Sequence, residues 1–272
     1  MNQLPNGEHR SYCPTLYPAL RAAEDRHFWF RARNLIIAEL VKQITADLRP
    51  GYGVLEVGCG TGNVLRVLEE VCPEGVVVGM DLFAEGLQYA RERTSCALVQ
   101  GDINLPPFDR QFHLIGAFDL LEHLPDDVQV LRNLHRMLVP GGTLLVTGPA
   151  HPTLWSYFDE ASHHCRRYRP AELKKKLIRT GYRVEYMTQY MASLFPLVLV
   201  GRWLAGGGDR GASGDVERMR DLASRELRVI PLVNSVLTWL LNKEIRMVAR
   251  RRKVPIGTSL LAIARKDGGS SK

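Results

Sequence analysis

Residues 54–62 read V-L-E-V-G-C-G-T-G, and this stretch decides the fold. A short apolar run, typical of a buried strand, ends in a glycine-rich turn, and residues 63–70 then begin a helical pattern. Gly58, Gly60 and Gly62 lack the Cβ atoms that would keep a ligand away from the backbone. A strand, a glycine turn and a helix in this order predict a site for a nucleotide-like cofactor.

The glycine spacing and a nearby acid narrow the kind of cofactor. A dinucleotide fold favours G-x-G-x-x-G and places a pyrophosphate at the helix N-terminus. Here the spacing is G-x-G-x-G, and Glu56 lies two residues before the first glycine. A carboxylate at this point repels phosphate but neutralises a cation. The pattern E-x-G-x-G-x-G resembles the first motif of class I S-adenosylmethionine (SAM) dependent methyltransferases, whose cofactor carries an ammonium and a sulfonium.

Short apolar runs that end in an acid follow in the order of that family, at residues 76–81, 98–102 and 112–119. Asp81 lies about 20 residues past the turn, where a carboxylate can accept both ribose hydroxyls. The resemblance implies that Asp102 receives the adenine amino group, with Leu82 and Ile103 on either side of the ring. The cofactor-binding residues predicted in this way are Glu56, Gly58, Cys59, Gly60, Gly62, Asp81, Leu82, Asp102, Ile103 and Asp119.

The resemblance implies an α/β, Rossmann-like class I methyltransferase fold, with a seven-stranded, mostly parallel sheet and helices on both faces. Residues 182–187 and 258–265 suit the sixth and seventh strands, and the roughly 70 residues between them require structure of their own. We therefore expect a helical insertion before the last strand. The predicted division is an N-terminal helical cap (1–48), the SAM-binding core (49–189), the insertion (190–255) and the final strand with the tail (256–272).

Composition agrees with one sizeable core plus extensions, since the chain has 272 residues, 45% of them apolar. Its five cysteines form no C-x-x-C pair, so a disulfide framework is not expected. We expect instead that the protein resides in a reducing cytoplasm. The net charge of +7 favours anionic partners. No recognisable nucleic-acid-binding module accompanies this charge, so nucleic acid is not the predicted partner.

The predicted insertion contains an apolar stripe at helical spacing, with Trp239 beside it. Its members are Val229, Val233, Val236, Leu237, Leu240 and Leu241. A basic cluster follows, made of Arg246, Arg250, Arg251, Arg252 and Lys253. An amphipathic stripe beside cations predicts a helix that lies in an anionic membrane interface. The alternative is a stripe packed on the core, with solvated cations.

Three segments near the cofactor motifs are candidates for binding the methyl acceptor. The first places three aromatic residues between cations near residue 30, the second follows the fourth strand, and the third follows the fifth. Guanidinium groups suit an anionic acceptor, although a solvated basic loop is the alternative. The predicted acceptor-binding residues are His27, Trp29, Arg33, His151, Trp155, His163, Arg167 and Tyr168.

Glu122 and His123 are the predicted catalytic residues. Methyl transfer to a hydroxyl removes a proton, and an imidazole is the commonest base, so His123 is the expected base. A structural or cofactor-orienting role is the alternative. The spacing D-x-x-E-H also resembles the metal-binding E-x-x-E-H of ubiquinone-pathway O-methyltransferases. Asp119 replaces the first glutamate there and shortens the reach, so no metal is predicted.

Three longer motifs resemble a bacterial branch of class I methyltransferases that often accompanies cell-envelope glycan or lipid biosynthesis. They are H-F-W-F-x-x-R-N, S-x-x-D-E-x-x-x-H-x-R-R-Y and V-P-I-G-T-S-L-L-A-I-A-R-K. The sequence thus predicts a cytoplasmic SAM-dependent methyltransferase, peripheral at the inner face of the membrane. It would act on an oxygen of a small-molecule or lipid-linked acceptor. The alternatives are methylation of nitrogen, carbon or sulfur, and an inactive SAM-binding scaffold at the membrane.

Overall fold

The computed structural model describes residues 16–108, 112–204 and 229–268. Within them, seven strands form one sheet: β1 (Gly53–Val57), β2 (Val76–Asp81), β3 (Ala97–Gln100), β4 (Phe112–Phe118), β5 (Leu138–Pro149), β6 (Tyr182–Tyr190) and β7 (Ser259–Lys266). The α-helices described are α1 (Tyr17–Ala23), α2 (Phe28–Thr45), α3 (Asn63–Val71), α4 (Ala84–Arg91), α5 (Asp127–Met137), α6 (Tyr157–Ala161), α7 (Pro170–Arg179), α8 (Phe195–Leu204) and α10 (Pro231–Ala249). Short 3-10 turns occur at η2 (Leu121–His123), η3 (Pro152–Leu154) and η4 (Ala192–Leu194).

The strands lie in the order β3-β2-β1-β4-β5-β7-β6, with β7 antiparallel to both of its neighbours. The pairs β2–β3, β1–β2, β1–β4 and β4–β5 are parallel. This confirms the predicted Rossmann-like class I methyltransferase fold with its mostly parallel sheet. Because β1 to β4 run in the same direction, their carboxyl ends lie along one edge, where ligands bind in open α/β sheets.

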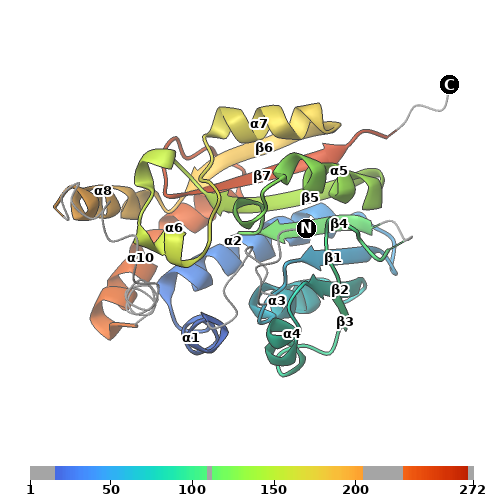
Figure 1. Cartoon of the computed structure of the whole chain (residues 1–272), viewed down its shortest axis with the longest axis horizontal. Helices are drawn as coiled ribbons and strands as arrows, with labels where there is room; N and C mark the ends of the chain where they lie inside the picture. The colour runs from blue at the N-terminus through green and yellow to red at the C-terminus, as the bar shows by residue number, and fades with distance from the viewer. Residues whose placement is uncertain (1–15, 109–111, 205–228, 269–272) are drawn as a thin grey trace, which may run out of the picture.

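Helices cover both faces of this sheet (Figure 1). On one face, Leu40 of α2 and Leu65 of α3 are buried in a cluster that also contains Leu241 of α10. On the other face, Leu131 of α5 and Leu177 of α7 are buried in a second cluster. Each such leucine contributes roughly 1.5–3 kcal/mol through the apolar surface that it removes from water. A sheet covered on both faces needs strands that are apolar throughout, which is why β1 and β2 lack an alternating pattern.

The insertion between β6 and β7 contains η4, α8 and α10, but the apolar stripe predicted there divides into two faces. The buried face of α10 packs against α2 and consists of Leu237, Leu241, Ile245 and Val248. The exposed face consists of Leu232, Val233, Val236, Trp239 and Leu240. The prediction of a single stripe is therefore wrong, because these residues spread over more of the helix circumference than α2 can cover.

Among the described residues, no helix combines the length and the apolar character that crossing a bilayer requires.

Candidate functional site

The glycine turn joins β1 to α3 with a backbone that L side chains rarely adopt. The φ angles of Gly58, Gly60 and Gly62 are +74°, +50° and +75°. A Cβ atom on Gly58 would lie 2.7 Å from Leu120 Cδ1, and one on Gly62 would lie 2.9 Å from the backbone of Ala90. The positive φ angles favour glycine at both positions, and at Gly62 the backbone of Ala90 also leaves no room for a side chain. At Gly60 the nearest atom would be 3.7 Å away, so this residue leaves space beside the turn.

A cavity of about 1670 Å³ opens at the carboxyl edge of the sheet. This volume exceeds the roughly 300–1,000 Å³ of ordinary small-molecule sites, so it can hold a cofactor and a second molecule. The predicted cofactor residues that line it are Glu56, Gly58, Cys59, Gly60, Asp81, Leu82, Asp102, Ile103 and Asp119. Gly62 is not among the lining residues, because it packs against α4. Its predicted contact with the cofactor stays a prediction.

Glu56 is a buried acid in the central strand of the sheet. It is 2% exposed and lies in register with Gly79 of β2 and Gly116 of β4. No described residue hydrogen-bonds its Oε2 atom. Burial raises the pKa of Glu56 well above its usual range, and the nearby charge of Arg33 offsets only part of that rise. A buried carboxyl oxygen without a hydrogen-bond partner is costly, so this position is suited to a ligand that brings a donor or a positive charge.

Asp81 and Asp102 follow two neighbouring strands and both organise backbone around them. Asp81 Oδ2 accepts a hydrogen bond from Gly60 N at 2.7 Å, and Oδ1 accepts one from Phe83 N at 2.9 Å. Burial raises the pKa of Asp81, while these backbone donors counteract the rise. Asp102 Oδ1 accepts from the backbone and side-chain nitrogens of Asn104 at 2.8 and 2.9 Å. The carboxyl groups thus lie in the cavity with their orientation already set.

Asp119 and Arg33 form an ion pair where the cofactor motifs meet α2. Arg33 Nη1 donates to Asp119 Oδ2 at 2.8 Å, and the Arg33 side chain is 8% exposed. The guanidinium also lies 5.0 Å from the centre of the Trp29 ring. Asp119 has a φ of +52°, a left-handed backbone at which Asp is enriched. Arg33, predicted as an acceptor contact, therefore lies beside a predicted cofactor residue.

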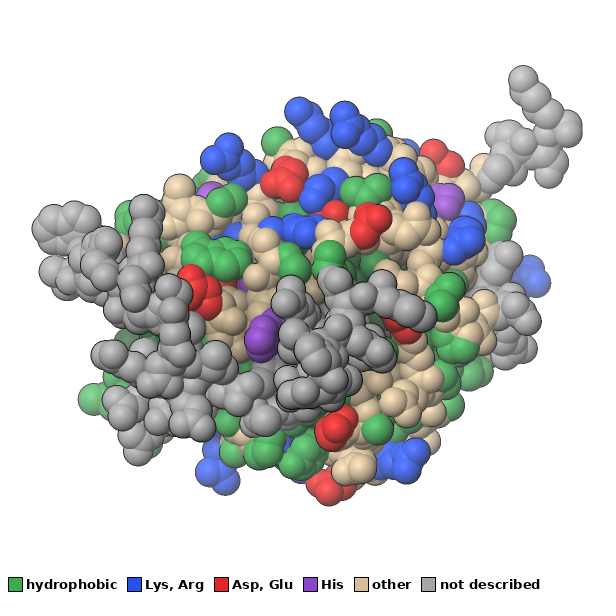
Figure 2. Space-filling model, in the orientation of Figure 1, with side chains coloured by type: hydrophobic (Ala, Val, Ile, Leu, Met, Phe, Trp, Pro, Cys, Tyr) green, Lys and Arg blue, Asp and Glu red, His purple; other side chains and the backbone are tan. Residues whose placement is uncertain are grey.

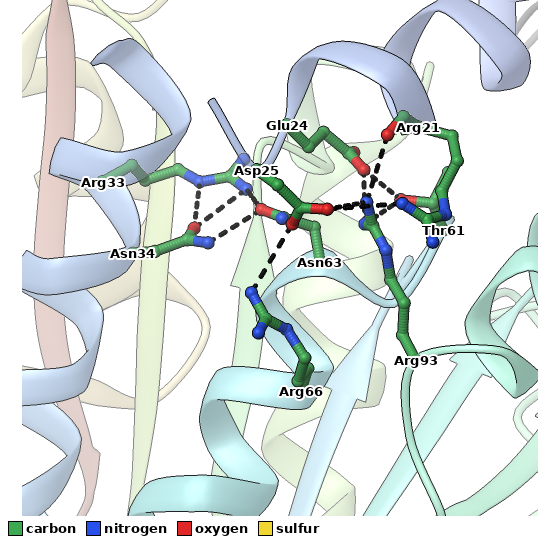
Figure 3. A network of polar contacts seen from close by, with 9 residues as sticks. All are labelled: Arg21, Glu24, Asp25, Arg33, Asn34, Thr61, Asn63, Arg66 and Arg93. Carbon is green, nitrogen blue, oxygen red and sulfur yellow. Dashed lines mark hydrogen bonds and ion pairs between the residues drawn. The ribbon is translucent and has the colours of Figure 1, made fainter. Parts of the chain in front are cut away.

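A polar network fastens α1 and the residues after it to the glycine turn (Figure 3). Glu24 Oε2 accepts from Thr61 Oγ1 at 2.5 Å and from Arg93 Nη1 at 2.6 Å. Arg93 Nη2 donates to Asp25, which also pairs with Arg66. The side chains of Arg93 and Glu24 are only 4% and 8% exposed, so this ion pair is shielded from water. Three sequence segments are thereby held around one end of the cavity.

We expect Arg93→Met to lower the free energy of unfolding by about 3 kcal/mol, because it leaves the buried Glu24 carboxylate without its cation. The matched control is Arg66→Met, which breaks the Arg66–Asp25 pair, whose side chains are 50% and 43% exposed. That change should cost less than about 1 kcal/mol. Urea unfolding followed by tryptophan fluorescence measures both. Equal losses for the two variants would contradict a structural role for the buried pair.

The predicted catalytic residues lie in η2, directly after β4. Glu122 is 1% exposed and His123 is 8% exposed. Burial, and then the charge of Asp119, raises the pKa of Glu122 well above its usual range. The His123 ring lies edge-to-face against the His164 ring, with centroids 4.7 Å apart. Glu122, His123 and His164 each place one ligand-type atom within 4.8 Å of the others.

Asp159 of α6 is a buried carboxylate that several residues of the loop after β5 contact. Its side chain is fully buried and accepts from His164 Nδ1 at 2.9 Å and from Arg167 Nε at 2.7 Å. Ser156 and Asp159 also form a capping box at the start of α6. Burial raises the pKa of Asp159, but the His164 hydrogen bond and the Arg167 charge outweigh it and lower the pKa to about 2. Asp159 is therefore a carboxylate at neutral pH.

The structure separates the predicted acceptor-binding residues into two groups. Those that line the cavity are His27, Trp29, Arg33, Trp155, His163 and Arg167. Tyr168 and His151 do not line it. The Tyr168 hydroxyl donates to Asp127 Oδ2 at 2.7 Å, and His151 Nε2 lies 2.5 Å from Gln189 Oε1. Internal partners thus take these polar groups, and the acceptor contact of both residues stays a prediction.

Arg167 lines the cavity, but its guanidinium already has protein partners. Nε donates to Asp159, and Nη1 donates to the carbonyl of Ala150 at 3.4 Å. Asp159 and His164 were not among the predicted site residues. Their signal was present in the spacing D-E-x-x-x-H of a quoted motif, yet spacing alone does not show that the two side chains meet. The network that ties Glu24 to Arg93 had no sequence signal, since the two residues are 69 positions apart.

Comparisons with known proteins agree with this geometry. Residues 28–186 match the model of a family described as "Methyltransferase domain". The chain is 30% identical over 165 residues to a probable SAM-dependent methyltransferase of Mycolicibacterium smegmatis, which covers 59% of this chain and 62% of the relative. It is 34% identical over 115 residues to the demethylmenaquinone methyltransferase of Listeria monocytogenes, covering 39% of this chain and 48% of that protein. The chain thus spans about half to three-fifths of these relatives.

Solved structures share the fold at low sequence identity. The [4+2]-cyclase SpnF has a TM-score of 0.59 and 19% identity, covering 94% of each chain. Phosphoethanolamine N-methyltransferase 2 of Haemonchus contortus, solved with SAM, has a TM-score of 0.53 and 18% identity, covering 85% of this chain and 52% of that one. At these identities the likeness establishes the fold alone, since one fold can carry many reactions.

Proposed function

The chain belongs to the methyltransferase-domain family of class I SAM-dependent methyltransferases, and we propose that it transfers a methyl group from SAM to an oxygen of a small-molecule or lipid-linked acceptor. The observation that carries this proposal is the set of three acids, Glu56, Asp81 and Asp102, around the glycine turn. They share one cavity with enough room for a second molecule. A fold-level likeness alone would not support an activity.

The residues of this cavity fit SAM. The unpaired Oε2 of Glu56 suits a cationic group, and the open side of Gly60 suits an approach to the backbone. Asp81 would accept the ribose hydroxyls, and Asp102 would accept the adenine amino group, with Leu82 and Ile103 beside the ring. When bound, SAM supplies an electrophilic methyl group on a sulfonium. The chain's own residues then have to orient the acceptor and receive its proton.

We assign contact with the reacting oxygen to His123 and Glu122, which lie together in η2. Burial raises the pKa of Glu122, which favours the protonated form, and a protonated carboxyl group can donate a hydrogen bond to that oxygen. Trp29 and Trp155 would provide flat apolar surfaces for the rest of the acceptor. Arg33 and His163, which also line the cavity, would add polar contacts.

The proposal is tested by incubating the protein with methyl-labelled SAM and bacterial lipid and glycan extracts. Mass spectrometry should find a product that has gained one labelled methyl group on oxygen. Heat-inactivated protein is the control. If SAM binds but no extract component is labelled, the result favours an inactive SAM-binding scaffold over an enzyme. If the label arrives on nitrogen, carbon or sulfur, the reaction class stands and the assigned atom changes.

We also propose that the insertion holds the protein at an anionic membrane surface. The exposed face of α10 carries Leu232, Val233, Val236, Trp239 and Leu240, and α8 adds exposed Leu197, Leu199 and Val200. Arg246 shares the face of Trp239, since seven residues make two helical turns. Further exposed cations follow α10 at Arg250, Arg251, Arg252 and Lys253. α8 also brings Val198 to the cavity, so a lipid-linked acceptor would enter from this side.

Wild-type protein should therefore co-sediment with vesicles of anionic phospholipid. Replacing the four cations at 250–253 by Ser should weaken this binding by at most about 4 kcal/mol, since each cation near the surface contributes about 1 kcal/mol. Positive charge also gathers over α7 (Figure 2). A control with the same charge loss replaces Arg169, Lys174, Lys175 and Arg179, and it should bind more tightly than the 250–253 variant. Wild-type protein that stays in the supernatant at low salt would disprove the membrane proposal.

A further inference from the structure

The loop after β5 places a carboxylate–imidazole pair in the same cavity as Glu122 and His123. Asp159 is fully buried, and His164 Nδ1 lies 2.9 Å from its Oδ1. Arg167 donates to the same oxygen at 2.7 Å. The backbone fixes the loop as well, because His164 N donates to Asp159 O at 2.8 Å and Cys165 N donates to Glu122 O at 2.6 Å. His164 is thus held in place against η2.

This arrangement determines which nitrogen of His164 can accept a proton. An ionised carboxylate only accepts hydrogen bonds, so Nδ1 of His164 must be the donor to Asp159. In the neutral ring Nε2 then carries the lone pair, and His164 lines the cavity. A base held by hydrogen bond to a third group is the arrangement that activates nucleophiles in several enzyme classes. The charged or titratable groups around His164 are Asp159, Arg167, Glu122 and His123.

We propose that His164, oriented by Asp159, is the group that accepts the acceptor's proton, and that His123 lies beside it as a contact of the reacting oxygen. This inference rests on the proposed function. It assigns the role of base to His164, whereas the sequence predicted His123 for that role. As the bond between the acceptor oxygen and the methyl group forms and the methyl–sulfur bond breaks, the hydroxyl proton passes to His164 Nε2. Asp159 touches no reacting atom and is a positioning residue.

The test compares two substitutions of His164 that differ in what they keep. His164→Asn retains a donor near the Nδ1 position, so the contact with Asp159 can persist, but it has no Nε2. His164→Ala removes the ring and leaves space for a free imidazole. Both should lower kcat by about 100-fold or more, while the affinity for SAM measured by calorimetry stays within a few-fold. Added imidazole should restore a substantial part of the activity of His164→Ala only. A role in structure alone would give no such rescue.

A second measurement does not depend on turnover. Nitrogen NMR of the wild-type protein without acceptor should show the His164 proton on Nδ1, and Asp159→Asn should abolish this preference, because an amide can donate to the ring as well as accept from it. Asp159→Asn should lower kcat by a larger factor than the factor by which it changes KM. His135→Asn, a histidine of α5 outside the cavity, is the control and should change neither quantity.

The outcomes separate the possible failures. If no acceptor is ever methylated but the tautomer result holds, the proposed function fails while the orientation of His164 stands. If His164→Asn keeps full activity, or imidazole rescues His123→Ala instead, His164 is not the proton acceptor. Glu122, His123 and His164 could also hold a metal ion. Loss of activity on chelation, with recovery on adding Zn²⁺ or Mg²⁺, would replace the base by a metal centre and overturn the proposal.

Discussion

Asp81→Ala is expected to lower the affinity for SAM by about 100-fold, equivalent to roughly 2–3 kcal/mol. The change removes the acceptor proposed for the ribose hydroxyls. It also removes the hydrogen bonds from Gly60 N and Phe83 N, which hold the glycine turn and the end of β2. The loss of binding should therefore come both from missing contacts and from a less ordered turn.

Calorimetric titration with SAM measures this loss of affinity. Two further variants separate the effect of the lost contacts from a general effect of charge. Asp81→Asn keeps the size of the side chain but offers a single acceptor oxygen, so its loss should be smaller than that of Ala. Glu85→Ala, an exposed acid of α4 outside the cavity, is the control for a general change in charge. Unchanged affinity in Asp81→Ala would exclude Asp81 from the cofactor site and with it the proposed orientation of SAM.

His123→Ala is expected to lower turnover by roughly 100-fold, while the affinity for SAM stays within a few-fold. His123 is assigned to the reacting oxygen, so its loss falls on the transition state more than on cofactor binding. The same change should not be rescued by imidazole if His164 is the proton acceptor. Single-turnover kinetics with a saturating acceptor separate the methyl-transfer step from product release.

The control for this variant is His135→Ala, because that histidine contacts Gly181 and Tyr182 and does not line the cavity. It should leave both turnover and SAM affinity unchanged. A parallel fall in SAM affinity for His123→Ala would instead assign this residue to the organisation of the cofactor site. That outcome would leave the methyltransferase proposal intact and remove His123 from the chemistry.

Several features of the site could be predicted from sequence because they obey local rules. Positive φ angles favour glycine, so the turn after β1 can be predicted from the glycine residues of the sequence. An apolar run that ends in an acid places that acid at the carboxyl edge of a parallel sheet, which is how Asp81 and Asp102 could be found. The seven-stranded, mostly parallel sheet followed from the family resemblance that these motifs carry, and the structure confirms it.

Charge and polarity did not reveal the internal partners of two residues predicted to contact the acceptor. Arg167 and Tyr168 were predicted to meet the acceptor, but Arg167 pairs with Asp159 and Tyr168 donates to Asp127. The residue type of a basic or aromatic side chain does not show whether its partner is a ligand or another residue of the chain. Only the path of the loop decides between these uses, since the two partners must come within hydrogen-bond distance.

The sequence by itself determined the glycine turn and the acids around it, because backbone conformation is dictated within a few residues, and the family resemblance of these motifs indicated the sheet. Tertiary structure decided the rest. It brought His164 against His123 and Asp159, paired Glu24 with Arg93, and divided the apolar residues of α10 between α2 and the surface. These contacts join separate elements, and their geometry depends on how helices and loops pack on the sheet, which no local rule of spacing contains.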